Sequence, residues 1–551
     1  MADTQIESLS TPAEDEQAQT NVGVARATGI LALGNVGSRA LGLAREIVLT
    51  NLFGASRAMD AFNYAILVPK TLYDLLIAGN VNSAIIPVLS EVVTRDGQKA
   101  LWQLVSVLLS LVTALIVALI LLIELFAPQV IALVSSGSDP STQALAADLL
   151  RIVTPALMFL SLFAILSGTL YALRSFTLPA MAGVIFNGSI VLGTLLLAPP
   201  LEVALNPSGI GWTLARPIEG IRAAAFGWVI GALAQMLLQL PGLRGARLRL
   251  TLNWKHPALR QIAKLYTPVM FSLILDALVR VFSYNLASQT GTGSVSYMNW
   301  ATTLIQFPQG LVATAISIAI LPTLARQSVL IERQAFRNTL GLGLRLAITL
   351  ILPATVGLFV LATPIIGLLF EHGAFTAGDT AVTALALRLY LIGLPFAAVD
   401  LLLVYAFYAQ QDTLTPALIG LVSLLLYMLV AILLLPSFGL FSLMIADSVK
   451  HVVHAVLSAV ILTRRLSGLG DQRLLMTVGK TGLATLVMGA LALLMLPILQ
   501  QVIGTASFIR ELLLVAISGG LSIAVFVGMA ALLRIEELSW LWTSLRQRLR
   551  G

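Results

Sequence analysis

Fourteen apolar runs, each long enough to cross a lipid bilayer, are the feature that most limits what this chain can fold into. A membrane-spanning helix needs about 20 mostly apolar residues, because the hydrocarbon core is about 30 Å thick. No soluble fold of this length hides so much apolar surface, so we expect an all-α polytopic membrane protein. The predicted spans are 24–50, 60–92, 101–127, 142–173, 178–199, 222–242, 262–288, 294–325, 338–369, 381–411, 414–435, 440–463, 476–502 and 508–533.

The composition excludes several classes of function. Only 11% of the 551 residues are charged, against roughly 25% in soluble domains. The chain has no cysteine and four histidines, so disulfides, thiolate catalysis and cysteine-bound metals are excluded and no metal centre is expected. It has no Walker loop and no convincing hydrolase motif, so we expect no catalytic residues and no direct use of ATP.

Basic residues are divided unevenly between the loops. The loops after even-numbered spans and the C-terminal segment hold nineteen Lys and Arg residues, whereas the other loops hold only Arg57, Arg216, Arg222 and Arg510. Because basic loops stay in the cytoplasm, both termini are predicted there. The net charge of +7 therefore indicates orientation rather than a nucleic-acid partner. The acidic segment 1–20 is predicted to be a disordered tail rather than a signal peptide, and 535–550 an interfacial helix.

Two regions of the chain resemble each other. AILVPKTLYDLLIAGNVNSAIIPVLSEV, from Ala65, and TLIQFPQGLVATAISIAILPTLARQ, from Thr303, each contain a mid-span proline, a following glycine and an I-x-P-x-L ending. The match is either chance among apolar residues or the mark of two homologous lobes, beginning near spans 1 and 7. Internal repeats with substrate between them are common in secondary transporters.

Ionisable residues at bilayer depth are costly and suggest function. Arg39 and Arg45 in span 1 are about 120° apart around a helix, which we interpret as a cationic cavity wall; snorkelling to an interface is the alternative. Span 2 carries Asp60 near its outer end, then Lys70 and Asp74 at i,i+4. That pair is either self-neutralising or part of the cavity.

The second half of the chain also has charges inside predicted spans. Asp276 and Arg280 are spaced i,i+4 in span 7, and Asp400 lies in span 10. Acids at this depth can hold Na⁺ or a proton, so Asp276 and Asp400 are candidate cation ligands, with neutralised pairs as the alternative. A proton relay is the less favoured interpretation, and a packed polar stripe the favoured one, for four residues on one side of span 12: Asp447, Lys450, His451 and His454.

Six stretches spread over most of the chain match one family of transporters. The more specific are SRALGLAREIVLTNLFGASRAMDAF (38–62) and FYAQQDTLTP (407–416). The others are GNVNSAIIPVLSE (79–91), GSVSYMNWATTLIQFPQG (293–310), ILPTLAR (320–326) and LFEHGAFT (369–376). In these stretches the chain resembles the MurJ (MviN) family of lipid II flippases.

The resemblance implies the fold of the multidrug/oligosaccharidyl-lipid/polysaccharide exporter superfamily, with about 14 transmembrane helices. Two six-helix lobes surround a central cavity, and two extra helices follow. The implied division is a tail at 1–20, an N-terminal lobe at 21–245, a C-terminal lobe at 246–470, and the extra spans with the interfacial helix at 471–551. The implied activity, part of peptidoglycan biosynthesis, moves undecaprenyl-pyrophosphate-linked precursor (lipid II) to the outer leaflet of the bacterial cytoplasmic membrane.

The family's site residues carry over unevenly. Arg39 and Arg45 fall on the span-1 arginines thought to meet the pyrophosphate, and Asp60 falls on the family's acid at the start of span 2. Tyr73 stands where the family has an arginine, and Thr303 where it has a further one. Ala78 and Thr302 likewise replace charged residues.

Two other basic residues lie near the missing arginines. Lys70 and Arg280 could restore the lost charge, one in each lobe. The predicted substrate-binding residues are therefore Arg39, Arg45, Asp60, Lys70 and Arg280.

The leading hypothesis is a lipid II flippase that works by alternating access. Alternatives are an exporter of another polyprenyl-linked glycan, a non-transporting scaffold for cell-wall enzymes, and a membrane-embedded glycosyltransferase, against which the short outer loops argue. Expected partners are the glycan lipid, the bilayer and cell-wall synthesis proteins. No cofactor is expected; the energy source is expected to be Na⁺, H⁺ or the membrane potential.

Overall fold

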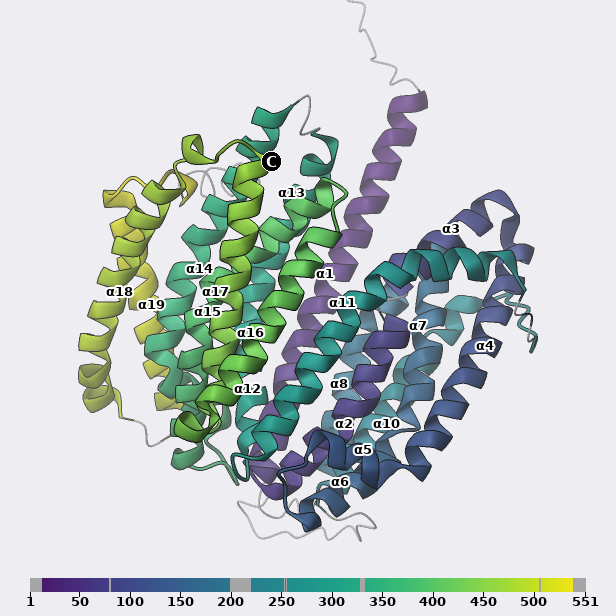
Figure 1. Cartoon of the computed structure of the whole chain (residues 1–551), viewed down its shortest axis with the longest axis horizontal. Coiled ribbons are helices and arrows are strands. Elements are labelled where there is room, and N and C mark those ends of the chain that lie inside the picture. The colour runs from purple at the N-terminus through teal and green to yellow at the C-terminus, as the bar shows by residue number, and fades with distance from the viewer. Residues whose placement is uncertain are drawn as a thin grey trace, which may run out of the picture. The chain divides into compact units, whose positions relative to one another are not determined.

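The computed structural model describes residues 12–78, 81–198, 220–251, 253, 255–327, 332–504 and 507–538, and these form helices without strands (Figure 1). They divide into two compact units that are each discontinuous in sequence. Unit 1 takes the described parts of 1–49, 64–130 and 144–274, and unit 2 takes those of 50–63, 131–143 and 275–551.

Unit 1 holds most of the helices from the first half of the chain. Its elements are most of α1 (Pro12–Phe53) and α2 (Arg57–Tyr73), the turns η1 (Asp74–Ala78) and η2 (Val81–Ile85), α3 (Ile86–Arg95), α4 (Gly97–Leu125), part of α5 (Ala127–Val134), most of α6 (Pro140–Val153), α7 (Ala156–Ala172), α8 (Thr177–Leu197), α10 (Arg222–Leu237), η3 (Leu240–Leu243) and the first half of α11 (Pro257–Ser288). Its core joins α3, α4 and α7 with the start of α11.

Unit 2 holds the rest of α11 and the later helices. These are α12 (Ser294–Pro308), the turn η4 (Gln309–Thr314), α13 (Ala315–Arg326), α14 (Arg333–Phe370), α15 (Ala377–Ala409), α16 (Leu414–Phe438), α17 (Phe441–Arg465), η5 (Gly470–Gln472), α18 (Leu474–Ile503) and α19 (Phe508–Leu532). Figure 1 shows α18 and α19, in yellow-green and yellow, beside α14, on which both pack.

The predicted polytopic all-α fold is confirmed. Twelve helical stretches among the described residues are long and apolar enough to cross a membrane. The two other predicted spans, 24–50 and 60–92, fall on α1 and on the run from α2 to α3. The structure is therefore consistent with fourteen spans.

The first helix begins earlier than the sequence predicted. α1 starts at Pro12, inside the segment expected to be a disordered tail. Residues 13–20, AEDEQAQT, are mostly good helix formers, and acidic residues near a helix N-terminus are favourable. The predicted interfacial helix at 535–550 lies mostly outside the described residues.

The two similar sequence regions both leave α-helical geometry after a proline. α2 contains Pro69 and continues into the π-helical turns η1 and η2, while α12 ends at Pro308 and continues into the π-helical turn η4. Proline removes a backbone N–H and disrupts the preceding turn, so the hydrogen-bond ladder changes register there. This shared break supports the interpretation of a repeat, although the lobe boundaries stay a prediction.

Small residues let the helices of unit 1 approach closely. A Cβ atom added to Gly193 of α8 would lie 2.9 Å from the Cα of Gly227 in α10, and one on Gly231 would lie 2.8 Å from the Phe186 carbonyl oxygen. Helices in a bilayer associate through such close packing, because lipid is as apolar as the side chains. α8 and α10 thus form a tight pair that can position side chains for a neighbouring helix.

Candidate substrate-binding and ion-binding sites

Arg45 of α1 is held by side chains from two helices. Its Nε lies 3.2 Å from Glu46 Oε1, and its Nη1 donates to Asn187 Oδ1 of α8 over 3.1 Å. The guanidinium lies 5.8 Å from the ring centroid of Trp228 in α10. Asn187 is fixed in turn, because its Nδ2 donates to the carbonyl oxygens of Ser38 and Gly183. Arg45 is therefore oriented in advance, and the neighbouring carboxylate of Glu46 offsets its charge.

The other predicted basic residues of unit 1 are more accessible. The side chains of Arg39 and Lys70 are exposed, whereas Tyr73 is half-buried against the core of unit 1. Asp74 begins the π-helical turn η1, so Lys70 and Asp74 are separated by a change of helix type rather than by a regular α-helical turn. The hydroxyl of Tyr266 donates to the Leu75 carbonyl oxygen within this turn, which satisfies part of its backbone.

Asp60 lies in unit 2, where it binds the start of α12. One carboxylate oxygen accepts from the Gly293 N–H (2.5 Å), and the other accepts from the Ser296 N–H (3.1 Å) and hydroxyl (2.7 Å). Asn63 Nδ2 donates to the same hydroxyl over 3.1 Å. Asp60 is only 4% exposed. The Asp60 side chain therefore caps the N-terminus of α12. Its contact with substrate stays a prediction.

Two of the matched stretches fit against each other near Asp60. The N–H of Ala374 donates to the Asn51 carbonyl oxygen over 2.8 Å. Gly373 has a φ of 62°, and a Cβ there would lie 2.3 Å from the same oxygen; Gly54, at φ 55°, meets the Ala374 carbonyl oxygen equally closely. Only glycine adopts this backbone at this distance without strain. The glycines of LTNLFGAS and LFEHGAFT are therefore explained by one backbone contact.

Further bonds join the same segments of unit 2. Asn285 of α11 donates through Nδ2 to the Leu133 carbonyl oxygen (2.7 Å) and to Ser136 Oγ (2.9 Å). The Gly137 N–H donates to Ser288 Oγ over 2.9 Å. We call these bonds, with those of Asn51 and Asp60, the loop contacts; they hold segments 50–63 and 131–143 to α11, α12 and the 371–376 turn.

The predicted residues of span 7 and span 8 lie in unit 2. Asp276 is exposed and Arg280 is half-buried on the second half of α11. The hydroxyls of Thr302 and Thr303 both donate to the Asn299 carbonyl oxygen over 2.9 Å, so they are satisfied within α12. Two ordinary helix back-bonds thus occupy the positions where the family has charges.

Asp400 of α15 is paired with two side chains of α17. Its Oδ1 lies 2.6 Å from His454 Nδ1 and accepts from the Ser458 hydroxyl over 3.1 Å. Both ionisable side chains are largely buried. Within the ranges that the structure describes, no three His, Asp or Glu side chains converge as a metal site would need. The partners of Asp400 therefore come from the packing of α15 against α17, and not from residues close to Asp400 in the sequence.

The rest of the polar stripe on α17 is paired separately. Lys450 Nζ donates to Asp447 Oδ1, and His451 Nε2 lies 3.6 Å from Asp447 Oδ2. The Lys450 ammonium also lies 5.6 Å from the ring centroid of Tyr427. The stripe therefore consists of two groups: Asp447 with its neighbours, and His454 with Asp400.

The FYAQQDTLTP stretch forms the turn between α15 and α16. The Asp412 carboxylate accepts from the Thr415 N–H (2.9 Å), the Thr415 hydroxyl (2.6 Å) and Arg465 Nη1 at the end of α17. The guanidinium of Arg465 also lies 5.3 Å from the Phe407 ring centroid. Burial raises the pKa of Asp412, but the bonds from Thr415 and Arg465 outweigh it and lower the pKa to about 2.

Arg465→Ala is expected to destabilise unit 2 by about 1–2 kcal/mol, because it removes a charged hydrogen bond from a largely shielded carboxylate. A depressed carboxyl pKa stabilises the fold above its unfolded value of about 3.9, and the contribution is lost as pH falls through the folded value. Thermal unfolding in detergent between pH 2 and 4 should therefore depend less on pH in Arg465→Ala. An unchanged melting temperature and pH slope would contradict this.

The arginines that the sequence analysis missed inside predicted spans include two of unit 2. Arg345 of α14 binds Glu537 Oε1 through Nε over 2.8 Å. Arg388 of α15 donates to the Phe359 carbonyl oxygen and to the Thr363 hydroxyl, each over 3.1 Å. Each carries the signal that singled out Arg39, a charge inside an apolar run. Asn187 and Trp228 carried no such signal, because neutral polar and aromatic residues are common in spans.

Comparison with known proteins gives the family. The family model described as "Lipid II flippase MurJ" matches residues 49–514. The chain belongs to the MurJ family. A lipid II flippase MurJ of Burkholderia cenocepacia is 33% identical over 69% of this chain and 72% of its own length. A probable lipid II flippase MurJ of Bdellovibrio bacteriovorus is 28% identical over 94% of this chain and 96% of its own length.

Solved structures agree with the fold of the MurJ family. A lipid II flippase MurJ in an inward closed conformation matches with a TM-score of 0.73 at 23% identity, over 92% of this chain and 99% of that one. An inward-facing MATE family transporter of the MOP superfamily matches with a TM-score of 0.64 at 15% identity, over 79% and 96%. At these identities the structures support the superfamily fold alone, and the family rests on the sequence matches.

Proposed function

We propose that this chain flips lipid II from the inner to the outer leaflet of the bacterial cytoplasmic membrane by alternating access. Its family and its curated relatives carry the name of lipid II flippases. The observation in the structure that carries the proposal is Arg45, a guanidinium on a membrane helix that Asn187 and Glu46 orient in advance. Arginine binds a pyrophosphate through two parallel hydrogen bonds, so a fixed guanidinium is an apt first contact.

Three further basic residues are also predicted to bind the substrate. Arg39 and Lys70 are exposed in unit 1, and Arg280 lies in unit 2. Lys70 and Arg280 supply charge that the family carries at the positions of Tyr73 and Thr303. Lys70→Ala and Arg280→Ala should each impair transport, and unchanged transport in both would remove these residues from the site.

Growth of a bacterium depleted of its own MurJ tests the proposal most directly. Expression of this chain should restore growth and cell shape if it moves lipid II. A scaffold that only recruits cell-wall enzymes would not restore growth, nor would an exporter of another glycan. Failure of a well-inserted chain to rescue would therefore contradict lipid II as the substrate.

Ion coupling is proposed at the acids of unit 2, without a bound cofactor. Asp400 contacts His454, and Asp276 is exposed on α11. In proteoliposomes, an imposed Na⁺ or H⁺ gradient or membrane potential should change the initial rate of lipid II transport. Asp400→Asn and Asp276→Asn should remove the response to the ion gradient. A response that persists in both variants would assign coupling elsewhere.

Both termini are proposed to be cytoplasmic, because basic residues concentrate in the loops after even-numbered spans. The natural chain has no cysteine, so single cysteines report position cleanly. Ser138→Cys should react with a membrane-impermeant thiol reagent added outside intact cells, whereas Gln98→Cys should react only after lysis. The opposite pattern would invert the orientation.

A further inference from the structure

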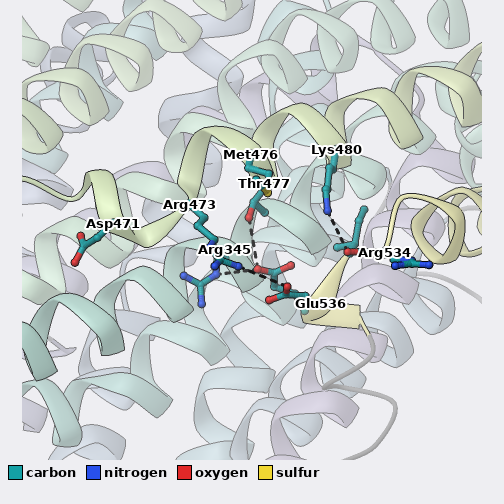
Figure 2. A pocket seen from close by; sticks show the side chains of 10 residues that line it. Arg345, Asp471, Arg473, Met476, Thr477, Lys480, Arg534 and Glu536 are labelled. Atoms are coloured by element: carbon teal, nitrogen blue, oxygen red, sulfur yellow. Dashed lines mark hydrogen bonds and ion pairs between the residues drawn. The ribbon is translucent and has the colours of Figure 1, made fainter.

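A small polar cavity lies in unit 2 where α18 and α19 reach α14 (Figure 2). Its volume is about 190 Å³. The lining includes four basic residues: Arg345, Arg473, Lys480 and Arg534. It also includes Asp471, Glu536 and Glu537. A basic side chain in this lining can bind an anionic ligand if no acidic side chain already neutralises it.

Arg345 and Asp471 are already neutralised within unit 2. Arg345 binds Glu537, which is only 8% exposed, and donates to the Gln472 carbonyl oxygen over 2.9 Å. Asp471 accepts from Arg337 and, over 2.7 Å, from Gln334. Arg345 and Glu537 form an ion pair with 2.8 Å between Nε and Oε1. In Figure 2 Arg345 lies among the other labelled side chains, while Asp471 lies apart from them. The cavity lining therefore includes an ion pair that stabilises the fold.

Lys480 and Arg534 carry charge that no acidic side chain offsets among the described residues. The Lys480 ammonium donates to the Arg534 carbonyl oxygen over 3.3 Å, and Figure 2 shows it directed from α18 toward that backbone. The Arg534 guanidinium has no hydrogen bond or ion pair with any residue in the described ranges. Arg473 is opposed only by Glu536, at 3.8 Å, and both side chains are mostly exposed. Two positive charges thus remain at one edge of the cavity.

The backbone of Arg534 shows that an arginine is not required by the turn. The N–H of Ile535 donates to the Ala530 carbonyl oxygen and that of Arg534 to Ala531, which are the paired bonds of a helix C-terminus that favours glycine. Arg534 occupies the left-handed position, with a φ of 50°. Glycine can therefore replace Arg534 without straining this turn.

Apolar side chains exposed beside the two charges complete the site. Leu475 is 89% exposed and Met476 55% exposed near the start of α18, and Leu532 is 77% exposed at the end of α19. α18 and α19 are both candidate membrane spans. Positive charge next to apolar surface at the end of a span matches a phospholipid, whose phosphate lies just above its acyl chains.

We propose that Lys480 and Arg534 bind the headgroup phosphate of an anionic glycerophospholipid of the phosphatidylglycerol class. Its acyl chains lie against Leu475, Met476 and Leu532. Under the proposed orientation the lipid belongs to the cytoplasmic leaflet. The site shares no residue with the proposed lipid II site, and it holds α18 and α19 at the membrane surface beside the Arg345–Glu537 ion pair.

Native mass spectrometry of the full chain in detergent tests this site. Phosphatidylglycerol and phosphatidylcholine with identical acyl chains are titrated in parallel. The wild type should bind phosphatidylglycerol about tenfold more tightly, a preference that corresponds to about 1.4 kcal/mol. The double variant Lys480→Gln with Arg534→Gly should lose that preference. Arg534→Gly alone should weaken it while leaving the lipid-free melting temperature unchanged or higher, since glycine suits the turn.

Arg174→Gly is the matched control. Arg174 occupies the same kind of turn in unit 1, with a φ of 59° and paired bonds from Ser175 to Leu170 and from Arg174 to Tyr171. This variant should keep the full preference for phosphatidylglycerol. The proposal is overturned by an equal loss in Arg174→Gly, by an unaltered preference in Arg534→Gly and the double variant, or by inorganic phosphate raising the melting temperature as much as phosphatidylglycerol does.

Discussion

Arg45→Ala should lower lipid II transport by about 10–100-fold, the loss that corresponds to one or two charge-assisted hydrogen bonds. Arg45 points its guanidinium from α1 with its orientation fixed by Asn187, so the variant removes a contact that is organised before substrate arrives. Arg45→Lys should keep part of the activity, because it keeps the charge but not the two-pronged geometry. Initial rates of fluorescent lipid II translocation in proteoliposomes measure both variants.

Glu46 provides the control for Arg45. Its side chain is 13% exposed, so Arg45→Ala leaves a largely buried carboxylate without its partner and can reduce activity by disturbing the helix. Arg45→Ala combined with Glu46→Gln removes that charge. If substrate binding is the cause, the double variant stays inactive. Recovery of transport in the double variant, or full activity of Arg45→Ala, would contradict a role in binding lipid II.

The spans could be predicted from sequence because each one is set by local composition. The run 101–127 is so apolar that its composition alone locates a span, and α4 covers Gly97–Leu125. The interruption of spans was less visible. Pro69 and Pro308 mark the two breaks in the sequence, but a proline alone does not show that π-helical turns follow it.

The site residues were found by charge, but their partners could not be. Asn187 is 142 residues from Arg45, and only the packing of α1, α8 and α10 brings them together. His454 was grouped with Asp447 by its spacing on α17, yet its ring contacts Asp400 on α15. Asp60 was assigned to substrate from the resemblance, and its bonds to Gly293 and Ser296 depend on the start of α12 packing against α2. The sequence shows which residues lie on the same face of one helix. Only the packing of the helices shows which side chains of other helices they contact.

Cross-linking the loop contacts should stop transport reversibly. Ser136 is exposed and Asn285 is half-buried; a 2.9 Å hydrogen bond joins them, and they are 149 residues apart in the chain. Alternating access requires segments that close one side of the membrane to separate in the next state. A short bis-methanethiosulfonate reagent applied to Ser136→Cys with Asn285→Cys should therefore abolish lipid II transport in proteoliposomes, and dithiothreitol should restore it.

A second pair separates the effect of the cross-link from that of the reagent. Gln289 directly follows α11 and donates through Nε2 to Asn285 Oδ1, so Gln289→Cys with Asn285→Cys places the same reagent between residues only four apart at the end of that helix. This cross-link joins two neighbouring residues that do not need to separate during the transport cycle, so transport should continue. Equal inhibition of both pairs would indicate damage to α11. Continued transport through the linked Ser136–Asn285 pair would show that these segments stay together throughout the cycle, and alternating access would then need its moving contacts elsewhere.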